Sequence, residues 1–186
     1  MDIQWNAVAA IGGLVTATIA IIALVVGGRR SRIALQTDLL LKYYDRFYST
    51  DMHHLRQTAC RKLISGKSPN YELEDVLDYF GIIGALLERK ALDQELTCGL
   101  FDWWIIRYWF CAEKYVESRR LDPEDSDYEM WAYLERLVNR MTSYRLKKKL
   151  PIISDSALHR FLREEARAKT NLVRSPKNSR GLCAES

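Results

Sequence analysis

FDWWIIRYWF, residues 101–110, is the stretch that decides the fold. Six of its ten residues are aromatic, and Asp102 and Arg107 carry its only charges. The apolar run around it, from Leu100 to Ala112, is too short and too charged to cross a bilayer, which takes about 20 residues. A surface that stacks nucleic-acid bases would interleave aromatic with several basic side chains, and only Arg107 is basic here. We therefore predict a core helix and no nucleic-acid partner.

The sequence around this stretch predicts an all-α fold. Apolar residues recur at helical spacing, and no run alternates apolar and polar residues as a half-buried strand does. The third and fourth predicted helices are joined by a very short link, so they should pack as an antiparallel hairpin. The expected bundle has about five helices, near residues 33–48, 52–66, 68–90, 93–118 and 126–141.

The N-terminal segment predicts a transmembrane anchor over residues 1–32. Residues 3–28 carry no charge and are followed by Arg29, Arg30 and Arg32. A cleaved signal peptide would carry its basic residues before the apolar run, so we expect an uncleaved signal anchor. Positive flanks stay cytoplasmic, which predicts a single-pass protein of the inner (plasma) membrane with its N-terminus outside and its helical domain cytoplasmic.

Small residues repeat every four positions in this segment, at Ala9, Gly13 and Ala17. Such spacing lets membrane helices approach closely. Self-association through this face is therefore one expectation for the chain, alongside a separate protein partner.

The rest of the chain consists of an acidic part followed by a basic part. Residues 33–140 hold 14 Lys and Arg against 19 Asp and Glu, whereas residues 141–186 hold 11 against 4. We expect an acidic helical bundle over residues 33–146 and a basic tail over 147–186. Within the tail, residues 154–169 have the pattern of a short amphipathic helix, and disorder is expected from Thr170.

The basic residues predict contact with membrane lipid. Lys and Arg near an anionic surface each gain about 1 kcal/mol. Phe161 and Leu162 could insert at the interface beside them; the alternative is a solvated tail that only aids solubility. The candidate lipid contacts are Arg29, Arg30, Arg32, Arg145, Lys147, Lys148 and Lys149.

Arg107 is the most informative residue of the aromatic stretch. Its neighbours three and four positions away on the helix include no acid, so a buried guanidinium would need a partner from another helix. The hairpin register brings it near Asp78, and Trp103 or Trp104 should stack on it. The pair either fixes helix register or forms the floor of a polar pocket with Asp102 and Glu88.

Catalytic signatures are weak. The acidic run EDVLD, residues 74–78, occurs once, whereas prenyl-chain chemistry requires two facing acidic clusters to hold magnesium. Adjacent residues His53 and His54 point about 100° apart on a helix and cannot share one metal ion. The four cysteines show no metal-ligand spacing and read as reduced thiols. We predict no metal, no cofactor and no catalytic residue.

A family resemblance supports the architecture. The segment VLDYFGIIGALLERKALDQELTCGLFDWWIIRYW, residues 76–109, and the later Trp131, Leu134, Glu135 and Leu137 carry it. They resemble an uncharacterised bacterial family catalogued as domain of unknown function 4760, over about residues 35–139. The resemblance implies one N-terminal span and a cytosolic helical domain; it implies no activity, cofactor or catalytic residue.

Taken together, these features favour a membrane-anchored cytosolic helical module for interaction or regulation, non-enzymatic and self-associating through the span. The alternative is a membrane-attached enzyme or small-ligand sensor with a polar pocket near Asp78 and Arg107. A third reading is a subunit whose partner holds the chemistry. Unpaired carboxylates in a concave pocket would favour the enzyme or sensor, whereas a closed core with paired groups would favour the module.

Overall fold

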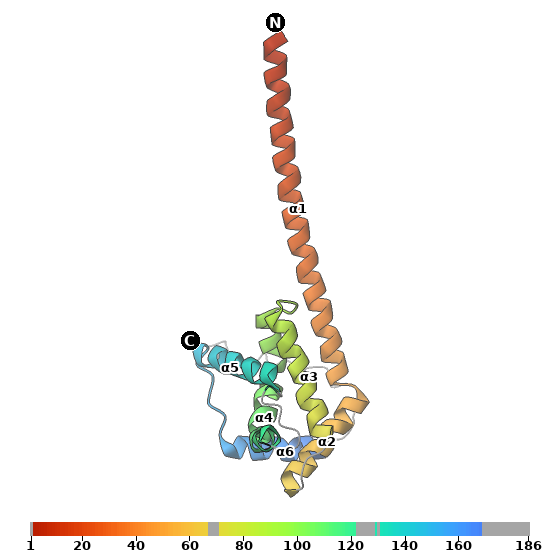
Figure 1. Ribbon diagram of the computed structural model, residues 1–186, viewed down its shortest axis with the longest axis vertical. Helices are drawn as coiled ribbons and strands as arrows, with labels where there is room; N and C mark the ends of the chain where they lie inside the picture. Colours follow the sequence, from red (N-terminus) through yellow and green to blue (C-terminus); the bar gives the residue numbers. More distant parts are fainter. Residues whose placement is uncertain (1, 67–70, 122–128, 130, 169–186) are drawn as a thin grey trace, which may run out of the picture.

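The computed structural model describes residues 2–66, 71–121, 129 and 131–168, with side chains from Ile19 onward. Within these residues the chain is all helical, which confirms the predicted all-α class. Figure 1 shows the helices in order: α1 Asp2–Phe47, α2 Thr50–Ser65, α3 Tyr71–Glu88, α4 Gln94–Arg120, α5 Ala132–Lys147 and α6 Asp155–Arg167.

The predicted transmembrane anchor is wrong for the described part of the chain, where no helix is long and apolar enough to cross a membrane. The predictions of a single-pass protein and of a signal anchor depend on this span and are wrong for the same reason. Ala9, Gly13 and Ala17 lie outside the residues whose side chains are described.

Helix α1 has two distinct halves. Its N-terminal half projects beyond the other helices, and its C-terminal half joins the bundle (Figure 1). Leu40 and Phe47 are fully buried there, and the hydroxyl of Tyr79 on α3 donates to the carbonyl of Tyr43. Phe47 also contacts rings from α3 and α4, so the end of α1 is part of the core.

The stretch at residues 101–110 is the central layer of the bundle, as predicted. Phe101, Ile105 and Tyr108 are completely buried on one face of α4. Each completely buried side chain of this size contributes roughly 1.5–3 kcal/mol by leaving water. The opposite face is open, because Trp103 and Phe110 keep 39% and 40% of their surface exposed.

The third and fourth helices run antiparallel, as predicted. The rings of Phe80 and Tyr108 lie 5.8 Å apart, and Tyr115 donates to Glu74 across 2.5 Å, so positions rise on α4 as they fall on α3. Helix α5 packs closely on α3, where a Cβ at Gly84 would lie 2.5 Å from the carbonyl oxygen of Tyr133. Glycine at this position permits that approach.

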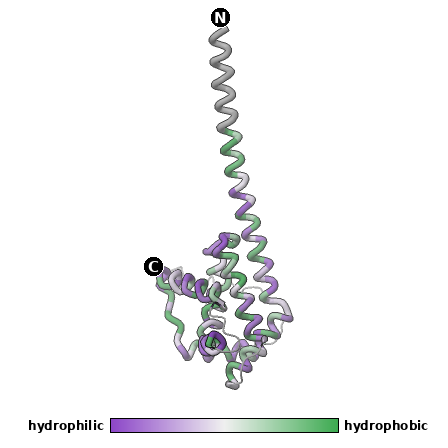
Figure 2. The backbone as a smooth tube through the Cα atoms, in the orientation of Figure 1, coloured by the Kyte–Doolittle hydropathy of each residue, from purple (hydrophilic) through white to green (hydrophobic). Residues whose placement is uncertain are grey.

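Helix α6 forms within the segment predicted to be an amphipathic helix. It packs against α2 and α4, in a bundle whose helices all mix hydrophilic and hydrophobic residues (Figure 2). Phe161 and Leu162 keep only 2% and 8% of their surface exposed. Their predicted insertion into a membrane interface is wrong, because the bundle itself covers them.

Candidate functional site

The predicted ion pair between Arg107 and Asp78 is wrong. Asp78 accepts a hydrogen bond of 2.7 Å from the indole Nε1 of Trp131, while Arg107 donates to the carbonyl of Trp103 across 2.8 Å. Burial raises the pKa of Asp78, and the bond from Trp131 opposes that rise. The predicted stacking is confirmed, because the Arg107 guanidinium lies 4.3 Å from the ring centre of Trp103.

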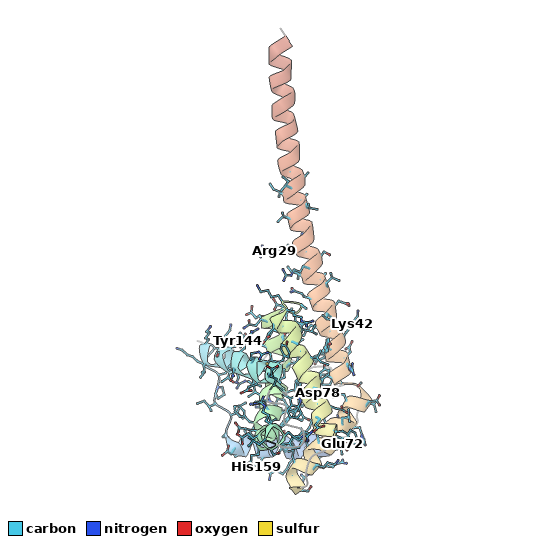
Figure 3. The ribbon with its side chains drawn as sticks, in the orientation of Figure 1. Arg29, Lys42, Glu72, Asp78, Tyr144 and His159 are labelled. Carbon is cyan, nitrogen blue, oxygen red and sulfur yellow. The ribbon has the colours of Figure 1, made fainter. Side chains whose placement is uncertain are left out.

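The predicted pair failed because Arg107 lies on a different face of α4 from the one that was expected to meet Asp78. The buried stripe of α4 carries Phe101, Ile105 and Tyr108, and Tyr108 contacts Phe80 of α3. Arg107 is off this stripe, since adjacent helical residues point about 100° apart. It therefore turns away from Asp78, an exposed residue of α3 that is labelled in Figure 3.

The other two predicted pocket residues also have separate partners. Asp102 pairs with Arg145 of α5 at 2.8 Å, and Glu88 pairs with Arg136 at 2.6 Å. The four residues do not form one polar pocket, and three carboxylates each have a partner from α5 or from Trp131 just before it. Burial lowers the pKa of Arg107 and the charge of Arg145 lowers it further, whereas the Asp102 carboxylate opposes this shift.

An apolar groove lies beside this pair, with a volume of about 330 Å³. It is bounded by α4, α5, the segment 148–153 and the start of α6. The groove stays open, because Leu146 and Ile152 keep 63% and 89% of their surface exposed. Its apolar lining comprises Ile106, Phe110, Leu146, Leu150, Pro151, Ile152, Ile153 and Leu158; Thr142, Arg145 and Asp155 add polar atoms.

Four of the predicted lipid-contact residues lie in or just after the part of α5 that borders the groove. Arg145 lines the groove and donates to the carbonyl of Pro151 across 3.0 Å. Lys147, Lys148 and Lys149 follow at the exposed end of α5. Their contact with lipid stays a prediction.

The arginines of α1 are placed differently. Arg29 lies on the projecting part of the helix (Figure 3), and Arg30 is exposed near it. Arg32 donates to the carbonyl of Lys90 across 3.2 Å, which ties α1 to the link between α3 and α4. These residues and the lysines that end α5 belong to separate elements, and a role for them in lipid contact stays a prediction.

A buried polar cluster, which the sequence reading missed, joins α2, α4 and α6. Arg56 Nε lies 3.3 Å from Glu165 Oε1, and both side chains are almost completely buried. The hydroxyl of Tyr108 donates to the same carboxylate oxygen across 3.3 Å. Aromatic rings hold the guanidinium on its faces, with Phe47 at 3.9 Å and Trp104 at 4.9 Å.

This cluster carries an electrostatic cost. Burial raises the pKa of Glu165, and the charge of Arg56 and the bond from Tyr108 oppose it. Arg56 Nε and Nη1 make no hydrogen bond within the described residues, so the attraction to Glu165 lacks good bonding geometry. A sequence signal did exist: Arg56 stands four residues after Met52 and three before Ala59, on the buried stripe of α2.

The same helix holds the C-terminal end of α6. His53, Gln57 and Arg61 follow one another at four-residue spacing and donate to the carbonyls of Ala168 and Ala166. Helix ends leave such carbonyls unsatisfied, and positive or donor groups there also complement the helix dipole. The half-buried His53 therefore has a structural position, and exposed His54 does not share it.

The described cysteines are unsuited to nucleophilic chemistry. Burial raises the pKa of Cys60 and Cys111 to about 12 and that of Cys98 to about 11. The thiolate is the reactive form, so these thiols are protonated and unreactive near neutral pH. Cys183 lies outside the described residues.

Fold and surface together define, within the described residues, an all-helical domain with a sealed polar cluster and an open apolar groove. The protein-family model described as Domain of unknown function (DUF4760) matches residues 10–141, and the chain belongs to this family. The match ends within α5, so α6 and nine of the eleven residues that line the groove lie beyond it. Comparison with curated proteins and with solved structures gave no match.

Proposed function

We propose that this chain is a non-enzymatic interaction module that docks an amphipathic helix of a partner protein in the groove between α4 and α5. The observation that carries the proposal is the open apolar lining. Leu146, Leu150 and Ile152 are 63%, 40% and 89% exposed while they line one concavity. A contiguous exposed apolar patch is typical of an interaction site.

A helix is the occupant that suits this surface. Amphipathic helices place apolar side chains into hydrophobic grooves at positions i, i+3, i+4 and i+7. The groove is lined in part by two helices, with Phe110 from α4 and Leu146 from α5 among its apolar residues. Its surroundings are basic, because Arg145 is followed by Lys147, Lys148 and Lys149. Charge complementarity therefore favours a partner helix with acidic residues beside its apolar face.

The hydrogen bonds that the acidic side chains make within the protein support an interaction module rather than an enzyme. Asp78, Glu88 and Asp102 each accept a hydrogen bond from a neighbouring side chain. A general acid or base needs a perturbed carboxyl group within reach of substrate. These three carboxyl groups are instead distributed among separate structural contacts, and the groove lining is predominantly apolar.

The proposal is tested with a photo-crosslinking amino acid placed in the full chain, expressed in its native cells. Phe110 and Ile152 receive the probe inside the groove; Ile64, which is 50% exposed on α2, receives it as a matched control. We expect both groove positions, and not the control, to label one protein. The labelled peptide should map to an acidic amphipathic helix.

A second variant makes the test specific. Leu146→Glu should abolish the adduct with little change in stability, because substitutions at exposed positions usually alter the free energy of unfolding by no more than about 0.5 kcal/mol. Labelling of a second copy of the chain, labelling of lipid, or equal labelling from Ile64 would each overturn the proposal.

A further inference from the structure

Three arginines from three helices lie close enough to interact electrostatically, and one of them, Arg145, lines the groove. Arg107 belongs to α4, Arg145 to α5 and Arg160 to α6. Burial is the main cause that lowers the pKa of Arg107, and the charges of Arg145 and Arg160 lower it further. Arg145 itself lines the groove, so the cluster is continuous with the apolar lining.

Arg107 differs from Arg145 in its partners. Arg145 is engaged by Asp102 at 2.8 Å and by the carbonyl of Pro151 at 3.0 Å. Arg107 stacks on Trp103 and donates one Nη1 bond to the carbonyl of that residue. Within the described residues no carboxylate pairs with it. A guanidinium has five N–H donors, so one edge of Arg107 keeps donors for another acceptor.

Arg107 does not line the groove itself but neighbours two residues of α4 that do. Ile106 precedes it and Phe110 follows it by three residues on α4, and both line the groove. Asp155 lines the groove too, and Asp102 is already paired with Arg145. Three guanidinium groups against two carboxylates leave a local excess of positive charge that favours an anion.

We infer that Arg107 binds an anion beside the groove, and that the segment docked there carries a carboxylate or a phosphate next to its apolar face. The inference rests on the proposed function and names the chemistry of the partner. The planar guanidinium, held by Trp103, presents its free edge for a bidentate contact with either anion.

The experiment uses four eight-carbon probes with the full chain: octanoate, octyl phosphate, octanol and octylamine. Tryptophan fluorescence reports binding, because Trp103 touches the Arg107 guanidinium. We expect the anionic probes to bind roughly tenfold more tightly than octanol, and octylamine more weakly still, since hydrogen bonds to charged groups are among the stronger ones. The preferred anion separates an acidic side chain from a phosphorylated one.

Variants decide whether Arg107 is responsible. Arg107→Gln should bring octanoate and octyl phosphate down to the affinity of octanol, and Arg107→Lys should restore part of the difference by keeping the charge without the fork. Arg163→Gln removes the same charge from an exposed position of α6 and should keep the selectivity. Unfolding curves confirm that each variant folds.

Two results would overturn the inference. Equal affinity of wild-type protein for octanol and the anions would do so while leaving an apolar docking groove intact. Saturable anion selectivity that survives Arg107→Gln would also do so. Failure of the proposed function is separate, because it would appear as absent groove crosslinks even where the anion selectivity holds.

Discussion

Two arginines rest on two adjacent tryptophans, and their surroundings are opposite. Arg56 lies 4.9 Å from the ring centre of Trp104, and Arg107 lies 4.3 Å from that of Trp103. Arg56 is sealed, with a buried Glu165 as its partner. Arg107 is half-buried beside an open groove and has no carboxylate partner among the described residues.

The difference separates a structural role from a binding role. A charge that is removed from water needs a partner within the protein, so Arg56 and Glu165 depend on each other. A guanidinium that keeps part of its surface in solvent can leave an edge free for a ligand. The first arrangement joins α6 to α2, and the second leaves α4 able to bind another molecule.

The largest expected effect comes from breaking the sealed pair. Arg56→Ala and Glu165→Ala should each lower the free energy of unfolding by about 3–5 kcal/mol, because each leaves a buried charge without its partner. Denaturant unfolding measures this. The control is Lys42→Ala, whose ion pair with Asp38 is exposed and should change stability by less than about 0.5 kcal/mol. Losses below 1 kcal/mol at both buried positions would contradict the sealed state.

Replacing both charges at once should have a smaller effect. In the double variant Arg56→Met with Glu165→Leu, no buried charge is left over, and apolar replacements of buried pairs are often neutral or stabilising. We expect it to recover most of the stability that either single alanine variant loses. A double variant as unstable as the singles would show that packing, rather than charge, dominates the site.

The pH dependence should be modest and of defined sign. The native pKa of Glu165 is raised above its ordinary 4.5, so the native state holds this proton more tightly than the unfolded state. Stability from this group is therefore present at low pH and is lost as pH rises through the native pKa. Relative to Glu165→Gln, wild-type protein should lose stability from about pH 4.5 upward; a relative gain would refute the raised pKa.

The smallest effect is expected at the open arginine. Arg107→Gln should lower the free energy of unfolding by less than about 1 kcal/mol, because a partly exposed cation–π contact contributes about 0.5–1 kcal/mol. The same denaturant experiment measures it beside Arg56→Ala. A loss comparable to that of Arg56→Ala would place Arg107 in the core and remove the distinction between the two sites.

The helical elements were predictable because their signals are local. Apolar spacing predicted the bundle, and the expected helix start at residue 93 and helix end at residue 66 coincide with an N-cap at Asp93 and a left-handed C-cap at Gly66. The antiparallel pairing of α3 and α4 followed from their short link. The stacking of Trp103 on Arg107 also followed, since the two residues are four positions apart on one helix.

The partners across helices were not predictable, because they depend on rotation as well as register. A buried arginine with an acid from another helix was expected, and the fold contains one, but it is Arg56 with Glu165. Its signal was the position of Arg56 on an apolar stripe. The groove had no comparable signal, since its lining comes from α4, α5 and the residues that lead into α6.

One NMR titration compares the two arginines directly. The side-chain Nε–H signals of Arg56 and Arg107 are assigned with Arg56→Lys and Arg107→Lys, and octyl phosphate is added to the full chain. We predict that the Arg107 signal shifts saturably while the Arg56 signal exchanges slowly with solvent and does not move. A shift at Arg56, or an unchanged signal at Arg107, would contradict the division between a sealed arginine and an open one.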